Sequence, residues 1–135
     1  RARANAELAR TLGLQSGDAV MQVRRLLTLG GTPTIFEDIW LPAQLFKGLN
    51  ADMLTTHQGP TYALFEKEFG VRTIRAEEQV RAVLPDAAQA ELLEVTPHTP
   101  LLQVDRVSYT YNDAPVEVRK GLYRTDTHYY KNTLS

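Results

Sequence analysis

The sequence predicts an α+β domain built on an antiparallel sheet of about five to six strands, with short helices between them. Two segments, 18–41 and 101–124, each hold two β-rich runs around a turn of Gly, Pro, Asn or Asp residues. A third, 75–84, alternates polar and apolar residues as strands do. Because the strands are joined mainly by hairpins and the helical patterns are short, α+β is favoured over a βαβ nucleotide-binding fold.

The first elements are a short helix and a hairpin. Residues 5–12 have the leucine spacing of one helical turn, and a glycine follows them. We expect strands over 18–29 and 35–41 around a Gly-Gly-Thr turn at 30–32. This turn places Arg25 opposite Glu37, whereas a turn of two residues would shift the register and separate them.

The middle of the chain predicts two helical segments and a strand. Residues 45–56 predict a helical turn or two, and 62–69 predict an amphipathic helix that Gly70 ends. The strand expected over 75–84 has one solvent-exposed face and one buried face, with Glu78 as a charged exception on the buried one.

A further helix and a second hairpin complete the domain. We expect a helix over 85–95, opened by Pro85 and Asp86. The residues expected on its buried side are Ala87, Ala88, Ala90, Leu92 and Leu93. Strands over 101–111 and 116–124 are then joined by an Asn-Asp-Ala-Pro turn.

Length and composition allow one compact domain. The chain has 135 residues, of which 43% are hydrophobic and 23% charged, and no stretch approaches the roughly 20 apolar residues of a membrane span. The formal net charge of −1 argues against DNA binding by this chain alone, because phosphate contacts need a basic face. Cysteine is absent, which excludes disulfides and fits a cytoplasmic protein.

The sequence shows no pattern of catalytic or metal-binding residues. His57, His98 and His128 lie far apart without the spacing of a metal site, so we expect surface histidines and no cofactor. Glu77 and Glu78 point to opposite faces of the expected strand and therefore cannot form a pair of catalytic carboxylates.

A resemblance to a known family rests on the order and spacing of residues along almost the whole chain. The matching residues are Leu12, Gly13, Leu14, Gly17, Val20, Arg25, Pro33, Glu37, Leu41, Pro42, Tyr62, Gly70, Leu92, Leu93, Pro100, Leu101, Leu102, Arg106, Tyr109, Pro115, Val116, Glu117, Tyr123, Arg124, Thr125 and Asp126. In this order the sequence resembles the effector-binding, chorismate-lyase-like (UTRA) domain of the HutC branch of GntR transcription regulators.

This resemblance implies the sensing and dimerising half of a bacterial transcription regulator. A winged helix-turn-helix would precede Arg1, residues 1–16 would be the connector, and 17–135 would be the UTRA domain. Such proteins form homodimers, and a small-molecule effector changes their affinity for operator DNA. The chain begins without Met, so we expect a fragment.

The resemblance also implies an effector pocket lined by Arg25 and Glu37, with the guanidinium holding an anionic group. The alternative is an ordinary cross-strand ion pair. Relatives that bind sugar phosphates carry a second Arg where this chain has Leu27, and a small hydroxyl residue where it has Pro60. A ligand with one carboxylate, or with an apolar or aromatic body, is therefore favoured over a phosphosugar.

Four more residues are candidates for this pocket. Thr61 and Tyr62 open a helix, where free N–H groups favour an anion; the alternative is that Thr61 caps the helix and Tyr62 packs in the core. Glu117 and Tyr123 match effector-contacting positions, but a straight strand would separate them by roughly 20 Å. Both reach one ligand only if the strand bends, for which Gly121 is the candidate; the alternatives are a solvated face and a packed aromatic.

Two other functions remain open at this stage. One is a dimerisation module with a vestigial pocket, and the other is an enzyme of the chorismate lyase type. Arg25, Glu37 and Glu117 around one cavity would favour sensing, whereas the same residues in bulk solvent would favour the dimerisation module.

Overall fold

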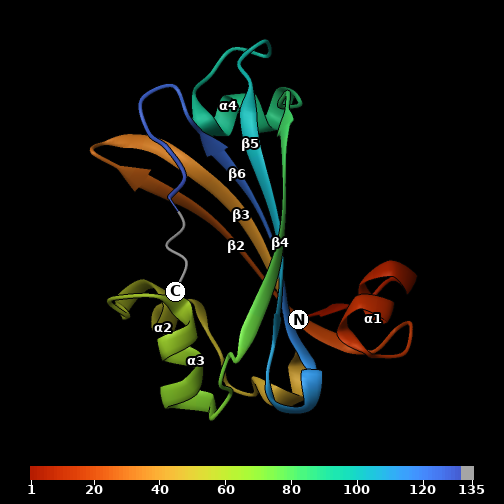
Figure 1. Ribbon diagram of the computed structural model, residues 1–135. Coiled ribbons are helices and arrows are strands. Elements are labelled where there is room, and N and C mark those ends of the chain that lie inside the picture. Colours follow the sequence, from red (N-terminus) through yellow and green to blue (C-terminus); the bar gives the residue numbers. More distant parts are fainter. Residues whose placement is uncertain (132–135) are drawn as a thin grey trace. The chain divides into compact units, whose positions relative to one another are not determined.

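The computed structural model describes residues 1–131 and confirms the predicted α+β class (Figure 1). Six strands form one sheet in the order β1-β2-β3-β6-β5-β4, and β1 and β2 pair antiparallel. The strands are β1 (Ala2–Arg3), β2 (Ala19–Leu29), β3 (Thr32–Pro42), β4 (Arg75–Val83), β5 (Leu101–Tyr109) and β6 (Pro115–Arg124). The α-helices are α1 (Ala6–Leu12), α2 (Ala51–Thr56), α3 (Thr61–Phe69) and α4 (Ala87–Leu93), with short 3-10 turns at Ala43–Leu45 and Tyr111–Asp113.

The chain divides into two compact units, each with its own apolar cluster. The first unit comprises Arg1–Val23, Ile39–Glu78 and Arg106–Arg119, and the second comprises the remaining segments of the chain. In the first unit, the Phe65 and Phe69 rings of α3 pack against Phe46, and α2 adds Met53 and Leu54 to the same cluster. A separate cluster under α1 includes Ala9, Leu12 and Val20. In the second unit, α4 contributes Leu93 to a cluster with Leu101 and Leu122.

Helix ends follow the predicted signals. The Asn5 side chain accepts a hydrogen bond from the Leu8 N–H at the start of α1, and Gly13 ends this helix in the left-handed region. Gly70 ends α3 in the same way, as expected. Gly70 therefore fixes where α3 ends.

The β2–β3 turn differs from the three-residue turn expected. Thr32 is already the first residue of β3, so only Gly30 and Gly31 lie between the strands, both with positive φ as a type I′ turn requires. The Arg25 side chain nevertheless donates to Glu37. The pair forms although only two residues separate the strands, so the expectation that a two-residue turn would separate it is wrong.

Helix α4 is shorter than predicted and buries fewer residues. Asp86 and Gln89 form a capping box at its start, and Glu94, not Val95, ends it with a left-handed backbone. Ala90 and Leu93 are buried as expected. Ala87, Ala88 and Leu92 are exposed, because a helix of seven residues turns only one narrow stripe to the core.

Strand β4 is exposed on both faces, so the buried face predicted for it is wrong. Only Glu78 and Val83 are half-buried, and Val80 is 52% exposed. The physical reason is that, among the described residues, no buried cluster includes a β4 side chain other than Val83 at the end of the strand. β4 is also the last strand in the order and pairs only with β5. No helix of the described chain is long and apolar enough to cross a membrane.

Candidate functional site

Arg25 and Glu37 form the ion pair that the sequence predicted across the first hairpin. The Arg25 Nε donates to Glu37 Oε1 at 2.8 Å, and Arg25 Nη2 donates to the same oxygen. The Glu37 side chain is 2% exposed and that of Arg25 is 21% exposed. A carboxylate is therefore held almost entirely out of water in the second unit, with a guanidinium beside it.

A second ion pair on the same hairpin is solvated. The Arg24 Nε donates to Asp38 Oδ1 at 2.8 Å, and the guanidinium lies 5.5 Å from the Phe36 ring centroid. This hydrogen bond to Asp38 raises the pKa of Arg24 above its ordinary value. Successive strand residues point to opposite faces. Arg24 therefore forms a solvated Arg–carboxylate ion pair on one face, and Arg25 forms a buried one on the other.

The first unit contains a buried polar network centred on Glu117. Glu117 Oε1 accepts from Ser108 Oγ at 2.8 Å, and Oε2 accepts from Arg119 Nη2 at 2.6 Å. The side chains of Glu117 and Arg119 are 6% and 16% exposed. Each carboxylate oxygen thus has a donor, as a buried charge requires.

The network continues to the first residue of α3. Arg119 Nη2 also donates to Thr61 Oγ1 at 2.5 Å, which ties α3 to strand β6. Pro60 is the N-cap residue, and no side chain of the described residues caps α3, so the alternative in which Thr61 caps the helix is wrong. Tyr62 is 56% exposed, so it does not pack in the core.

Tyr123 lies in the second unit and contacts Tyr130. Their ring centroids are 5.4 Å apart in an edge-on arrangement. A Cβ at Gly121 would lie 2.8 Å from the Tyr123 ring, so glycine at this position gives the ring its space. The structure shows this use of Gly121 and leaves untested whether Glu117 and Tyr123 touch one ligand.

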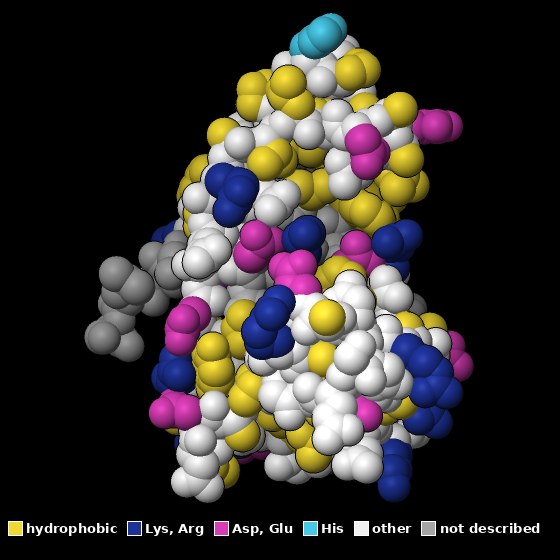
Figure 2. Space-filling model, turned by 90° about the vertical axis from the view of Figure 1, so that its right-hand side faces the viewer, with side chains coloured by type: hydrophobic (Ala, Val, Ile, Leu, Met, Phe, Trp, Pro, Cys, Tyr) yellow, Lys and Arg dark blue, Asp and Glu magenta, His cyan; other side chains and the backbone are white. Residues whose placement is uncertain are grey.

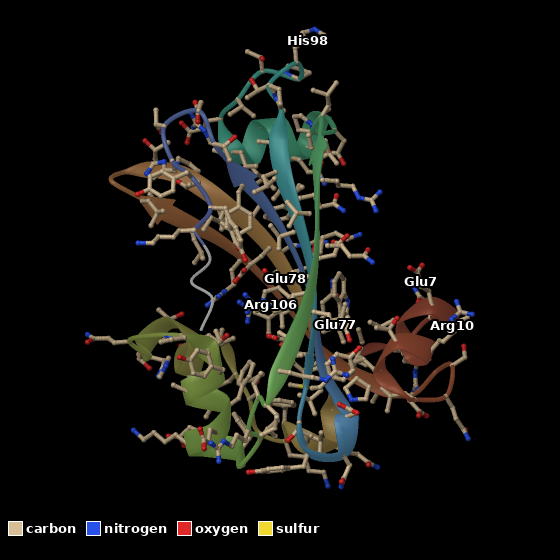
Figure 3. The ribbon with its side chains drawn as sticks, viewed as in Figure 1. Glu7, Arg10, Glu77, Glu78, His98 and Arg106 are labelled. Atoms are coloured by element: carbon tan, nitrogen blue, oxygen red, sulfur yellow. The ribbon has the colours of Figure 1, made fainter. Side chains whose placement is uncertain are left out.

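Glu77 and Glu78 point to opposite sides of β4, as predicted (Figure 3). Arg106 and Glu78 point toward one another, and Arg106 Nε donates to Glu78 Oε2 at 2.8 Å. This bond joins β5 to β4, so Arg106 holds the two strands together.

Two residues of the polar network were missed by sequence reasoning. Arg119 lies two residues after Glu117 on one strand, so the two side chains lie on the same face. This spacing could have predicted their contact. Ser108 reaches Glu117 only through the β5–β6 register, and the turn at 112–115 suggested by composition would not give this pairing. The segment that follows β5 instead contains a 3-10 turn with left-handed Asn112 and Asp113.

The histidines occupy separate places. His98 is exposed in the loop that follows α4, and His57 Nε2 lies 3.0 Å from the Pro60 carbonyl oxygen. Within residues 1–131, no group of three His, Asp or Glu side chains is arranged to hold a metal ion. On the face shown in Figure 2, basic and acidic side chains are interspersed, without an extended area of one sign.

These features define a small α+β domain whose sheet carries buried Arg–Glu pairs, and its fold is that of the effector domains of GntR-family regulators. A chain assigned as the ligand-binding domain of a GntR-family regulator from Bordetella bronchiseptica is 51% identical. It has a TM-score of 0.91 over 99% of this chain and 83% of that one. The effector domain of PhnF from Mycobacterium smegmatis is 31% identical, with a TM-score of 0.83 over 99% and 81% of the two chains.

The sequence comparisons agree with the structural ones. The HTH-type transcriptional repressor PhnF of Mycolicibacterium smegmatis is 36% identical over 119 residues, which are 88% of this chain and 48% of the relative. The chain spans about half the length of the curated relatives it matches. The UTRA domain profile matches residues 1–129, and the chain belongs to the UTRA domain family. The family predicted from the sequence is confirmed, whereas its HutC branch stays a prediction.

Proposed function

We propose that this chain is the effector-sensing and dimerising part of a bacterial transcription regulator and not an enzyme. In this proposal a small molecule binds the domain and changes operator binding by a winged helix-turn-helix that precedes Arg1. Residues 1–16 act as the connector, and the regulator works in the cytoplasm on DNA. Membership of the UTRA family and the regulatory role of the relatives support this proposal.

The observation that favours sensing over a purely structural role is the burial of two carboxylates, Glu37 and Glu117, at 2% and 5% exposure. Burying a charge is costly, and well-packed apolar residues often give equal or greater stability at such positions. The Glu117 network also joins the sheet to Thr61 at the start of α3. A ligand that competes for Arg119 or Thr61 would therefore change how α3 is held on β6.

The ligand that fits best is an acidic or partly apolar metabolite. Arg25 and Arg119 each provide a planar set of donors that suits a carboxylate. Leu27 and Pro60 stand where phosphosugar-binding relatives have phosphate-holding groups, so a sugar phosphate is disfavoured. The candidate ligand-binding residues are Arg25, Glu37, Thr61, Tyr62, Glu117 and Tyr123, to which the structure adds Arg119 and Ser108.

The mechanism needs only a difference in ligand affinity between two states of the dimer. A ligand that binds one state better shifts the equilibrium toward it by that difference in free energy. We propose that the bonds of Arg119 to Thr61 and Glu117 differ between these states, because they link a helix to a strand through a single nitrogen.

The test is a thermal-shift screen of the 135-residue chain against small organic acids, aromatic acids, amino acids and sugar phosphates. A ligand specific for the folded state stabilises it, by about 2.7 kcal/mol at a concentration 100-fold above Kd. We expect one carboxylate class to raise the unfolding temperature saturably, and sugar phosphates to raise it least.

Variants on one hairpin give a matched control. Arg25→Ala is expected to lose the ligand-induced shift and Arg24→Ala to keep it, because Arg24 forms the solvated pair on the other face. Glu117→Gln keeps the size of the side chain and is expected to weaken the shift. No stabilisation by any class, or equal loss in Arg24→Ala and Arg25→Ala, would contradict the proposal.

A further inference from the structure

Strand β4 is a long sheet edge that the described chain leaves open. It has nine residues, it is last in the strand order, and its only neighbour is β5. Open edges of this length are commonly protected by charged side chains, Pro, a bulge or a covering segment, because free N–H and C=O groups recruit other strands. β4 contains no Pro or Gly, and its charged residues are of both signs.

The apolar residues of β4 are exposed where the sequence pattern would bury them. Val80 is 52% exposed, and Leu84, which follows the strand, is 60% exposed. Ala76 and Ala82 are also exposed. Polar and apolar residues alternate along β4 as in a strand with one buried face, yet both of its faces are exposed. Within residues 1–131 the strand therefore lacks a covering partner.

The charges of β4 are complementary to those of a second copy in antiparallel orientation. Pairing about Gln79 overlaps the whole strand, from Arg75 to Val83, and sets Glu77 opposite the Arg81 of the other copy. The two-fold symmetry makes this contact twice. In the described chain Arg81 has no ion-pair partner, while Glu77 is 61% exposed and bonds only to Arg75 on its own strand.

The backbone supports the same register. The Ile74 N–H donates to the Tyr109 carbonyl at 2.8 Å, so residue 74 points toward β5. In a regular strand the even-numbered residues then face β5, and the odd-numbered ones direct their N–H and C=O groups to the free edge. Gln79 with its symmetry mate, and Glu77 with Arg81, would thus be hydrogen-bonded pairs.

The other edge of the sheet lacks this complementarity. β1 pairs with β2 only at Ala2 with Val20 and Arg3 with Ala19, which leaves the rest of β2 open. β2 contains two arginines and no acidic residue, so two copies would bring like charges together. Of the two edges, β4 is the one suited to a second copy of the chain.

We propose that two copies of the chain pair through β4 in antiparallel orientation about Gln79, with two Glu77–Arg81 ion pairs across the interface. This inference rests on the dimerising part of the proposed function and gives that dimer its surface. A two-fold pairing of this kind is isologous, which matches the symmetry of regulators that bind two operator half-sites.

The test is sedimentation equilibrium of the 135-residue chain and of charge variants. The unmodified chain is expected to dimerise, and Arg81→Glu or Glu77→Arg alone is expected to raise the dimer dissociation constant at least about tenfold, because each creates two like-charge contacts. Mixing the two single variants restores complementary pairs and should give a heterodimer. The double variant E77R/R81E should dimerise again.

Arg10→Glu on α1 is the matched control, since Arg10 is exposed and remote from β4 in sequence, and it should dimerise like the unmodified chain. Circular dichroism and thermal unfolding verify that the single variants fold. A monomeric unmodified chain, unchanged dimerisation in both single variants, or failure of the mixture to associate would overturn the β4 pairing. The ligand-induced thermal shift is measured separately, so its persistence in monomeric Arg81→Glu separates failure of this pairing from failure of sensing.

Discussion

The two units hold their buried carboxylates in different ways. In the second unit, Glu37 accepts from Arg25 across one hairpin, between strands that are adjacent in sequence. In the first unit, Glu117 accepts from Arg119 on its own strand and from Ser108 on β5, and Arg119 continues to Thr61 on α3. The Arg25–Glu37 bond joins two strands of one hairpin, and the bonds of Glu117 and Arg119 join three elements.

The difference indicates which site couples to a change of structure. A pair within one hairpin can respond to a ligand by local adjustment. The Glu117 network joins a helix to two strands, so displacement of one bond changes contacts between elements. We therefore expect the Glu117 network to contribute more to stability, and more to the response to ligand, than the Arg25–Glu37 pair.

The largest expected effect is that of Glu117→Ala. This change leaves Arg119, whose side chain is 16% exposed, without its carboxylate partner, and breaking a buried pair in this way costs roughly 3–5 kcal/mol. Urea unfolding monitored by circular dichroism would measure the loss. Glu117→Gln should lose less, because the amide oxygen still accepts from Ser108. Equal losses in the two variants would mean that the charge accounts for the whole effect and that the bond to Ser108 contributes nothing.

Arg25→Ala is expected to destabilise the chain by a smaller amount, about 2 kcal/mol. The Arg25 side chain is 21% exposed, so water offsets part of the lost interaction with Glu37. The same urea titration applies, with Arg24→Ala as the solvated counterpart, expected to change stability by less than about 1 kcal/mol. A loss in Arg25→Ala that exceeds the loss in Glu117→Ala would reverse the comparison between the two units.

The contrast between the sites also explains what the sequence could predict. The Arg25–Glu37 pair lies within one hairpin, so counting residues back from the turn along its two strands predicted it. The prediction held although the turn was assigned one residue too many. The Glu117 network depends on the β5–β6 register and on where α3 meets the sheet. Neither follows from local pattern, because both are set by packing between distant segments.

The same reasoning applies to the fold. The two hairpins and the glycines that end α1 and α3 are local features, and the sequence predicted them. Which strand lies at the edge is a property of the whole sheet, so the exposure of Val80 on β4 could not be predicted from its alternating pattern. Likewise, Leu92 has the spacing of a buried helical residue but is 42% exposed on α4.

Thr61→Val sharpens the comparison within the first unit. Valine keeps the shape of threonine but removes the hydroxyl that accepts from Arg119, so we expect a loss of about 1 kcal/mol. Hydrogen exchange of α3 amides should also increase, because the helix loses its polar link to β6. If α3 exchange is unchanged while stability falls, the bond to Arg119 stabilises the fold without holding the helix in place.

The smallest effect is expected for a pair at the end of β6, Arg124 with Asp126, whose carboxylate side chain is 43% exposed. The Arg124 Nη2 donates to Asp126 Oδ2 at 2.7 Å, and this hydrogen bond lowers the pKa of Asp126 below its ordinary value of 3.8. A carboxylate with a lowered folded-state pKa stabilises the fold above its unfolded-state pKa, and this contribution is lost as the pH falls through the folded-state value. The difference in unfolding temperature between the unmodified chain and Asp126→Asn should therefore be small at pH 7 and vanish at strongly acidic pH. A difference that stays constant down to low pH would show that the Asp126 charge does not stabilise the fold, leaving Arg124 to act through its bond to the Leu93 carbonyl at the end of α4.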